Sequence, residues 1–338
     1  MLYSPGGGVA AMEDKSIFPI SDHYDGVRFS NPWGVQIAKS MAELVRWKIA
    51  SKPRAWPRSE VANTSTPQLA APVLASAVHV TYIGHATVYL QDHSHNILTD
   101  PQFSVRASPV SFAGPSRSRK PALEVAALPG VQTVLVSHNH YDHMDLPSLR
   151  ALDRHFKPTF VVPLGNAKFL HKVGIARVIE LDWWERWQNI QLVPAQHWSA
   201  RGLSDRNKAL WGGYVISMSS TKVFFAGDTG YGPHFKMIRD RCGAMDLSLL
   251  PIGAYEPRWF MKDQHMNPSD ATMAHLDLGS RFSFAMHFET FRLTDEGFLE
   301  PRQDLAHSLA QRQITPSHFI IPEVGHTILV KADQWSVI

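Results

Sequence analysis

The sequence predicts an α/β protein in which two β-sheets pack face to face with helices outside them, an αββα sandwich. Short apolar or β-branched segments, broken by Gly, Asp-Pro or His-Ser, recur through both halves of the 338 residues. Segments with helical periodicity separate many of them. Each half is thus a set of strands plus helices, and two such halves bury their apolar faces when the sheets pack together.

The expected strands of the first half lie at residues 79–84, 86–91, 95–100, 133–138 and 159–164, with helical or loop material at 148–156. Those of the second half lie at 189–197, 212–218, 222–228, 247–253 and 281–287, with a helix at 268–278. Strand ends of such a sandwich meet along one edge, where α/β folds usually expose reactive groups.

Residues 1–75 are expected to form an extension, and residues 76–338 a single sandwich domain. Within the extension, residues 35–50 have helical periodicity, with apolar residues three or four apart at Ile37, Met41, Leu44, Val45 and Ile49, and with Lys39, Arg46 and Lys48 among them. This basic amphipathic helix would dock on the domain, on a second subunit in a homodimer, or on a membrane; packing against protein is the commoner outcome.

The composition excludes several classes of protein. A net charge of +3 without runs of Lys or Arg argues against a nucleic-acid binder. The single cysteine, Cys242, excludes both an intramolecular disulfide and a thiolate metal cluster. No secretory leader is recognisable, and no apolar run reaches the roughly 20 residues of a membrane span. We therefore expect a cytoplasmic protein, with peripheral membrane contact as the alternative.

The most informative segment is VSHNHYDHMD, which follows a β-branched strand and contains His138, His140, Asp142 and His143. Imidazole and carboxylate ligands suit Zn, Fe or Mn at an open catalytic site, whereas closed structural sites favour thiolates. In extended backbone, alternate residues point the same way, so His138 and His140 can reach one ion. The turn beyond them would send Asp142 and His143 towards a second. A histidine-rich surface turn is the weaker alternative.

One loop cannot complete two coordination spheres, so further ligands are expected at the ends of later strands. His197, Asp228 and His287 each end an apolar strand-like segment of the second half. One such residue alone is more often a satisfied core residue, but three in succession favour a binuclear metal site.

The chain resembles the metallo-β-lactamase superfamily and, within it, the N-acyl-phosphatidylethanolamine-hydrolysing phospholipase D family. The resemblance runs from about Arg28 to the carboxyl end. The short metal motif is shared by the whole superfamily, whereas the segments PIGAYEPRWFMK and ELDWW are far more specific. The other segments that carry it are YIGHATVYL, ILTDPQFSVRASP, AQHW, FFAGDTGY, DQHMNP and MHFETF.

The resemblance implies a metallo-β-lactamase-like catalytic domain with two zinc ions, for which iron or manganese are the alternatives. It implies that one ion is held by His138, His140 and His197, that the other is held by Asp142, His143 and His287, and that Asp228 bridges them. It also implies that His265 faces the substrate phosphate. Glu289 stands where the family usually has glycine and is expected to add a carboxylate near the metals.

The expected reaction is cleavage of a phosphodiester in N-acyl phosphatidylethanolamine, giving N-acylethanolamine and phosphatidic acid. Two cations sharing a carboxylate lower the pKa of a water, so no protein nucleophile is required. We class Asp142, Asp228 and His265 as catalytic. His265 would protonate the leaving alkoxide or, alternatively, only position substrate. Gln264 and Trp259 are expected to contact substrate as well.

Two further side chains have open roles. Asp145 would either orient a ligand imidazole or cap the helix that follows it. His85 would support the metal ligands or satisfy a buried turn.

Other functions remain as alternatives. A lactonase, or a hydrolase of small soluble phosphodiesters, would use the same site with a smaller pocket. An iron oxygenase would leave the second ligand set incomplete, and a nuclease would need stronger positive charge. A non-catalytic module is disfavoured, because buried ligand clusters are costly without a metal.

Overall fold

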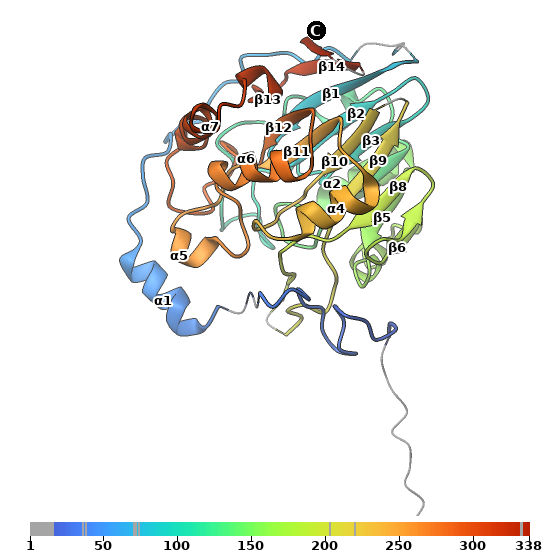
Figure 1. Cartoon of the computed structure of the whole chain (residues 1–338). Coiled ribbons are helices and arrows are strands. Elements are labelled where there is room, and N and C mark those ends of the chain that lie inside the picture. Colours follow the sequence, from blue (N-terminus) through green and yellow to red (C-terminus); the bar gives the residue numbers. More distant parts are fainter. Residues whose placement is uncertain are drawn as a thin grey trace, which may run out of the picture.

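The computed structural model describes residues 17–35, 37, 39–69, 73, 75–202, 204–219, 221–331 and 334–338, and it has the predicted αββα architecture (Figure 1). Within these residues two sheets are formed. One has the strand order β15-β14-β1-β2-β3-β4-β5-β6, and the other has the order β13-β12-β11-β10-β9-β8-β7. The first 16 residues of the predicted extension lie outside the described residues.

The first sheet contains the five strands predicted for the first half of the chain and three more. Its strands are β1 (Ala77–Gly84), β2 (Thr87–Gln91), β3 (Asn96–Thr99), β4 (Thr133–Leu135), β5 (Thr159–Pro163), β6 (Val178–Leu181), β14 (Thr327–Lys331) and β15 (Gln334–Val337). β14 pairs with β1 although all the other strands except β15 lie between them in the sequence. The expectation that each half builds its own sheet is therefore wrong at the carboxyl end, because β1 needs a partner on its outer side.

The second sheet contains β7 (Arg186–Trp187), β8 (Ile190–Val193), β9 (Gly213–Met218), β10 (Thr221–Phe225), β11 (Leu247–Pro251), β12 (Phe282–Met286) and β13 (Phe319–Ile320). Strands β7 to β10 are antiparallel and β10 to β13 are parallel. Every residue of β11 and β12 is buried. Covered on both faces, these strands read as continuous apolar runs, LSLLP and FSFAM, instead of alternating ones.

Helices cover the outer faces of both sheets. α2 (Leu146–Phe156) and α3 (Ala167–His171) pack on the first sheet through a cluster that includes Leu149, Leu152 and Leu170. α4 (His234–Cys242), α6 (Pro268–Asp277) and α7 (Glu300–Gln311) lie over the second sheet (Figure 1) and join the main core. The short helix α5 (Arg258–Met261) lies apart from them, beside α1 (Figure 1).

Helix α1 (Met41–Ala50) is shorter than the predicted helix at 35–50. It begins where Ser40 and Glu43 form a capping box. Only part of the predicted apolar face docks: Leu44 packs on the domain and Ile37, ahead of the helix, is buried, whereas Met41, Val45 and Ile49 are 74%, 50% and 81% exposed. Trp47 is buried against Phe260 and Met261, which both belong to α5. A ten-residue helix is thus held mainly through one aromatic side chain.

The sequence also predicts a polar, Pro-rich link at residues 51–72, and the part of it that the structure describes, residues 51–69, crosses the edge of the domain from α1 towards β1 (Figure 1). It is tied to the domain by hydrogen bonds: the Arg54 amide donates to the Asp295 carbonyl at 2.9 Å, and the Trp56 indole donates to the Glu296 carbonyl at 2.8 Å. The domain boundary at residue 75 stays a prediction. In the described parts of the chain, no helix combines the length and apolar character needed to cross a membrane.

Replacing Trp47 with Ala should release α1 without unfolding the domain, because the cluster around Trp47 is separate from the main core. Loss of a buried Trp removes about 3 kcal/mol or more of local packing. Limited proteolysis within residues 41–50 should therefore accelerate at least ~10-fold. The control is Ile49→Ala on the exposed face of the same helix, which should leave cleavage unchanged; equal protection of both variants would contradict the assigned docking.

Candidate metal centre

The seven predicted ligands converge at one edge of the sandwich, although the strands end earlier than predicted. β4 ends at Leu135, so His138, His140, Asp142 and His143 all lie in the loop before α2. His197 and Asp228 follow β8 and β10 in loops, and His287 directly follows β12. His138 and His140 therefore lie beyond the strand instead of within it, although their side chains meet as the alternation argument predicted.

Two glycines allow these loops to approach one another. A Cβ on Gly253, after β11, would lie 2.1 Å from the carbonyl oxygen of His287. A Cβ on Gly227 would lie 2.5 Å from the Cβ of Ser137, in the loop that leads to His138. Any larger residue at either position would push a ligand loop away from the cluster.

The first ligand group consists of three imidazoles. Nδ1 of His140 lies 2.8 Å from Nε2 of His138 and 3.2 Å from Nε2 of His197. Oδ2 of Asp228 lies 3.9 Å from the His138 nitrogen and 4.0 Å from the His197 nitrogen. Four ligand atoms thus surround one point.

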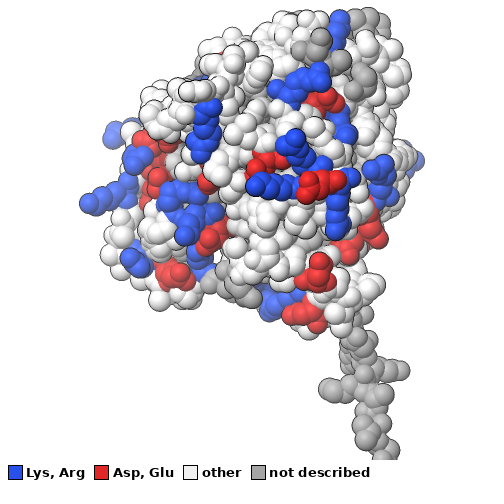
Figure 2. Space-filling model, in the orientation of Figure 1, with Lys and Arg blue, Asp and Glu red and all other residues white. Residues whose placement is uncertain are grey.

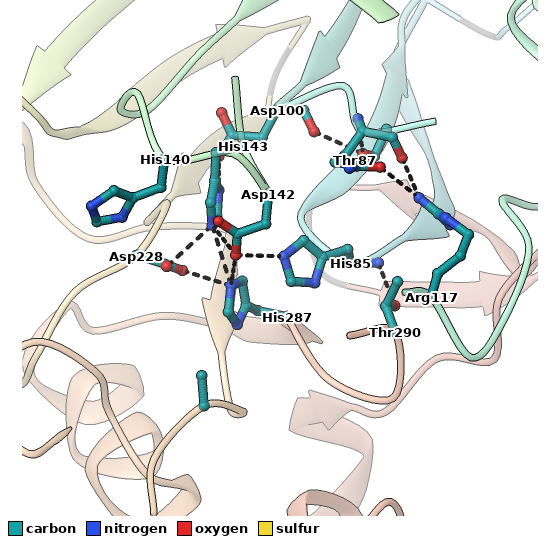
Figure 3. Close-up of polar contacts among 12 residues, drawn as sticks. His85, Thr87, Asp100, Arg117, His140, Asp142, His143, Asp228, His287 and Thr290 are labelled. Atoms are coloured by element: carbon teal, nitrogen blue, oxygen red, sulfur yellow. Dashed lines mark hydrogen bonds and ion pairs between the residues drawn. The ribbon is translucent and has the colours of Figure 1, made fainter. Parts of the chain in front are cut away.

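The second group also contacts Asp228, as Figure 3 shows. Nε2 of His143 lies 3.1 Å from Asp228 Oδ2, and Nε2 of His287 lies 3.2 Å from Asp228 Oδ1. Oδ2 of Asp142 lies 3.4 Å from both imidazole nitrogens, which are 3.2 Å apart. The Asp228 carboxylate is therefore placed between the two groups, as a bridging ligand must be.

The hydrogen bonds around the cluster make a cation the best occupant of the first group. His197 Nδ1 donates to the Gln264 carbonyl at 2.9 Å, which leaves the lone pair on Nε2. The Ser137 hydroxyl donates to Asp100 at 2.6 Å and so accepts from His138 Nδ1, which leaves the lone pair of His138 on Nε2 as well. One proton on His140 cannot fully satisfy both lone pairs, whereas a metal ion among the three nitrogens can.

The charges of the site also call for a cation. Asp100, Asp142 and Asp228 are buried. Within the described residues their ion-pair partners are histidines, and no Lys or Arg pairs with them. Burying three carboxylates without positive charge is strongly unfavourable.

The imidazole pKa values follow from this environment. Burial, reinforced by neighbouring histidines, holds the pKa of His138 and His197 well below the usual value, and burial lowers the pKa of His140 to about 4. These side chains are therefore neutral at pH 7, the form that binds metals. Burial alone would also lower the pKa of His143, but the carboxylates around it, Asp228 foremost, raise it well above its usual value.

Asp100 is a supporting residue that the sequence interpretation missed. Its Oδ2 accepts from His143 Nδ1 at 2.6 Å, and its Oδ1 accepts from the Ser137 amide at 2.7 Å. It thereby orients His143 directly and His138 through Ser137. The available signal was its position: Asp100 follows the apolar strand β3, as the predicted ligands follow theirs.

Asp145 does not orient a ligand imidazole. It occupies the N-cap position of α2 but forms no capping hydrogen bond with the helix backbone. Its carboxylate accepts instead from the Ser104 hydroxyl at 2.7 Å and from the Ser148 hydroxyl. Asp145 therefore fulfils neither predicted role. Its carboxylate instead links Ser104, in the loop after β3, to Ser148 in α2.

His85 lies against the second ligand group (Figure 3). Its Nε2 is 3.1 Å from Asp142 Oδ2, and its ring is centred 4.1 Å from that of His287. Its backbone carbonyl accepts from the His287 amide at 2.8 Å and from the Tyr82 hydroxyl at 3.1 Å. Both alternatives for His85 therefore apply, because it contacts a ligand and also satisfies a buried turn.

A cavity of about 540 Å³ opens over the cluster, and His140, Asp142, Asp228, Gln264 and His265 contribute to its wall. Its other lining residues are largely apolar and include Met41, Leu44, Trp47, Trp198, Phe260, Met261 and Leu293, with Lys39 and Arg206 as the cations. The volume is that of a typical small-molecule site. Trp259 is not part of the lining: it is 39% exposed and stacks on Arg46, because its neighbour Phe260 turns inwards.

His265 faces the candidate bridging residue, with Nδ1 3.8 Å from Asp228 Oδ2. Burial lowers the pKa of His265 to about 4. A neutral imidazole can donate an N–H hydrogen bond but carries no extra proton to transfer near pH 7. The environment therefore favours substrate positioning over proton donation.

Glu289 does not add its charge to the metal cluster. It is buried and forms ion pairs with Arg119, at 3.3 Å, and with Arg302. Its backbone has a φ of 55°, in the left-handed region where glycine is the usual residue. The expected carboxylate is therefore neutralised by two guanidinium groups, and within the described residues no ion pair joins it to a predicted metal ligand.

Comparison with known proteins agrees with this geometry. Residues 95–288 match the Beta-lactamase superfamily domain. The chain is 37% identical over 268 residues to "N-acyl-phosphatidylethanolamine-hydrolyzing phospholipase D 1" of Caenorhabditis elegans. The aligned region covers 74% of this chain and 75% of the C. elegans protein. The chain belongs to this superfamily and, within it, to the N-acyl-phosphatidylethanolamine-hydrolysing phospholipase D-like family. It is thus a metal-dependent hydrolase.

A second member of this phospholipase D-like family is the Saccharomyces cerevisiae protein named "N-acyl-phosphatidylethanolamine-hydrolyzing phospholipase D, mitochondrial". It is 36% identical over 74% of this chain, which spans about half (55%) of the yeast protein. Among solved structures, Igni18, a metallo hydrolase from Ignicoccus hospitalis, has a TM-score of 0.56 at 21% identity and covers 75% of this chain and 99% of its own. An isothiocyanate hydrolase from Delia radicum gut bacteria has a TM-score of 0.59 at 21% identity. The match covers 75% of this chain and 100% of the hydrolase. These two structures show the fold.

Replacing Asp100 with Asn should weaken metal binding roughly 10- to 100-fold, because the negative charge that orients His143 directly, and His138 through Ser137, is lost. Competition with a chromogenic chelator, at a fixed metal concentration, measures this change. Asp145→Asn is the matched control, since that carboxylate contacts only serines, and its metal affinity should equal that of the parent. Equal affinities for all three proteins would show that Asp100 has no such role.

Proposed function

We propose that this protein is a binuclear zinc phosphodiesterase that cleaves N-acyl phosphatidylethanolamine to N-acylethanolamine and phosphatidic acid. The observation that carries the proposal is the position of Asp228, which contacts both ligand groups at the base of a largely apolar cavity. The relatives named for this activity support the choice of substrate. A lactonase or a hydrolase of small soluble diesters remains the alternative outcome.

The donor set fits two zinc ions. His138, His140 and His197 would hold one, Asp142, His143 and His287 would hold the other, and Asp228 would contact both. Neutral imidazole and carboxylate donors without thiolate are typical of catalytic zinc, and iron or manganese would accept the same set. When bound, the two ions would supply Lewis acidity towards phosphoryl oxygens and a water of lowered pKa.

The protein side chains would then orient the substrate. His265 donates its neutral N–H towards the phosphodiester beside Asp228, and Gln264 offers its side chain from the same loop. Phe260, Met261 and Leu293 provide apolar surface on the cavity wall for an acyl group. A diester with long apolar substituents would bury much of this surface, which a small lactone would leave wetted.

Purified protein loaded with zinc should contain about two ions per chain and should release N-acylethanolamine from N-acyl phosphatidylethanolamine. Asp228→Asn should reduce the rate by at least ~1000-fold, because the carboxylate shared by both ions is lost. The assay combines elemental metal analysis with mass spectrometric product detection, using plain phospholipids, bis(p-nitrophenyl) phosphate and lactones as parallel substrates.

The control is Asp240→Asn on the exposed side of α4, which should retain full activity. Turnover of lactones alone would replace the proposed substrate, and about one iron per chain without hydrolysis would point to oxygen chemistry.

We also propose that α1 brings the cavity to a membrane surface. Its exposed apolar residues Met41, Val45 and Ile49 lie four apart, and Arg46 and Lys48 lie between them. Met41 and Leu44 also line the cavity, so the helix is part of its wall. Elsewhere, Figure 2 shows basic and acidic side chains interspersed over the visible face, without a broad area of one sign. Contact through α1 is therefore local, as for interfacial amphipathic helices.

The double substitution Val45→Asp, Ile49→Asp should weaken binding to vesicles of anionic phospholipid roughly 10-fold or more, since two apolar side chains can no longer insert. Co-sedimentation measures the binding. Leu276→Asp, at a half-exposed position on α6, is the matched control and should bind as the parent does. If the double variant instead converts a dimer to a monomer with vesicle binding unchanged, α1 is a subunit interface.

A further inference from the structure

Arg206 is a cation in the cavity wall, separated from the metal ligands by one aromatic ring. The ring of Trp198 is centred 4.4 Å from that of His140, and the guanidinium carbon of Arg206 lies 4.2 Å from the centre of the Trp198 ring. The guanidinium also donates to the Ile37 carbonyl, which fixes its position. A ligand bound at the metal cluster would therefore have its substituents close to a fixed positive charge.

This charge has no carboxylate partner among the residues that the structure describes. The other cation of the cavity wall, Lys39, pairs with Asp263 at 3.2 Å. Arg206 forms no such pair and donates only to a backbone carbonyl. An arginine that is half removed from water without a counter-charge is unfavourable, unless a ligand supplies negative charge.

The stack on Trp198 has a second consequence. Proteins commonly bind quaternary ammonium groups on the faces of aromatic rings, and tryptophan is the best such ring. Here Arg206 already occupies one face of Trp198, and His140 packs on the indole at an interplanar angle of 65°. A choline or free ethanolamine headgroup would thus lose its aromatic site and would also be repelled by the guanidinium.

We infer that Arg206 determines headgroup specificity: the cavity selects phosphodiesters whose headgroup carries no positive charge and rejects those with an ammonium group. This inference rests on the proposed function for the identity of the substrate. An N-acylated ethanolamine satisfies the requirement, because an amide nitrogen is not protonated, so the lipid is net anionic. Phosphatidylcholine, with the same phosphate and a quaternary ammonium, does not.

The direct test is a binding comparison with two ligands that differ only in the ammonium group, ethyl phosphate and phosphocholine. Isothermal titration of zinc-loaded protein should show ethyl phosphate bound about 10-fold more tightly, the effect of one like-charge contact in a partly solvated site. Arg206→Gln should reduce this preference to about one, and Arg206→Glu should reverse it. An unchanged preference in Arg206→Gln would overturn the inference.

Two further variants separate charge from packing. Arg206→Lys keeps the charge but loses the planar stack on Trp198, and it should retain most of the preference. Arg150→Gln makes the same charge change on the exposed side of α2, away from the cavity, and should behave as the parent. If Arg206→Lys loses the preference as fully as Arg206→Gln, packing and not charge sets it, and the inference fails.

A turnover experiment distinguishes this inference from the proposed function. N-acyl phosphatidylethanolamine and phosphatidylcholine, each dilute in nonionic detergent micelles, are offered to the parent and to Arg206→Gln. The ratio of the two kcat/KM values should fall about 10-fold in the variant. If the parent cleaves neither lipid but still prefers ethyl phosphate to phosphocholine, the proposed function is wrong while the role of Arg206 stands.

Discussion

Three buried carboxylates, Asp100, Asp142 and Asp228, face a group of imidazoles, with no Lys or Arg paired to them in the described part of the chain. This charge pattern is the constraint on which the rest of the structure depends. The surrounding protein lowers the pKa of some histidines by burial and raises that of His143 through the carboxylates. The neutral imidazoles are in the form that binds a metal, and the raised pKa of His143 shows how strongly the carboxylates favour positive charge at this site.

The αββα architecture meets this constraint by supplying ligands from both sheets. The loop after β4 and Asp100 after β3 belong to the first sheet, while Asp228 and His287 follow strands of the second. Bound cations would therefore link the two sheets, so metal binding and the stability of the sandwich are coupled. The parallel strands β11 and β12 are covered on both faces, which gives His287 a rigid base.

Around this shared centre, particular residues of this chain shape the cavity. α1 turns Val45 and Ile49 outwards beside the opening and is held through Trp47 and Leu44. Arg206 is stacked on Trp198 instead of being paired with a carboxylate. Glu289 forms ion pairs with two arginines instead of with the ligand cluster. In the proposed function, substrate choice depends on the cavity wall, whereas the ligand cluster determines the chemistry.

The sequence by itself determined the fold class, ten of the strands and the seven residues that converge, because apolar periodicity and ligand chemistry are local properties of the chain. It did not reveal that β14 returns to pair with β1, that Asp100 rather than Asp145 supports the imidazoles, or that Trp47 docks α1 while Trp259 faces outwards. These depend on contacts between segments far apart in the chain. Only the tertiary structure decides them, because a side chain's partner is set by the packing of whole elements and not by its neighbours in sequence.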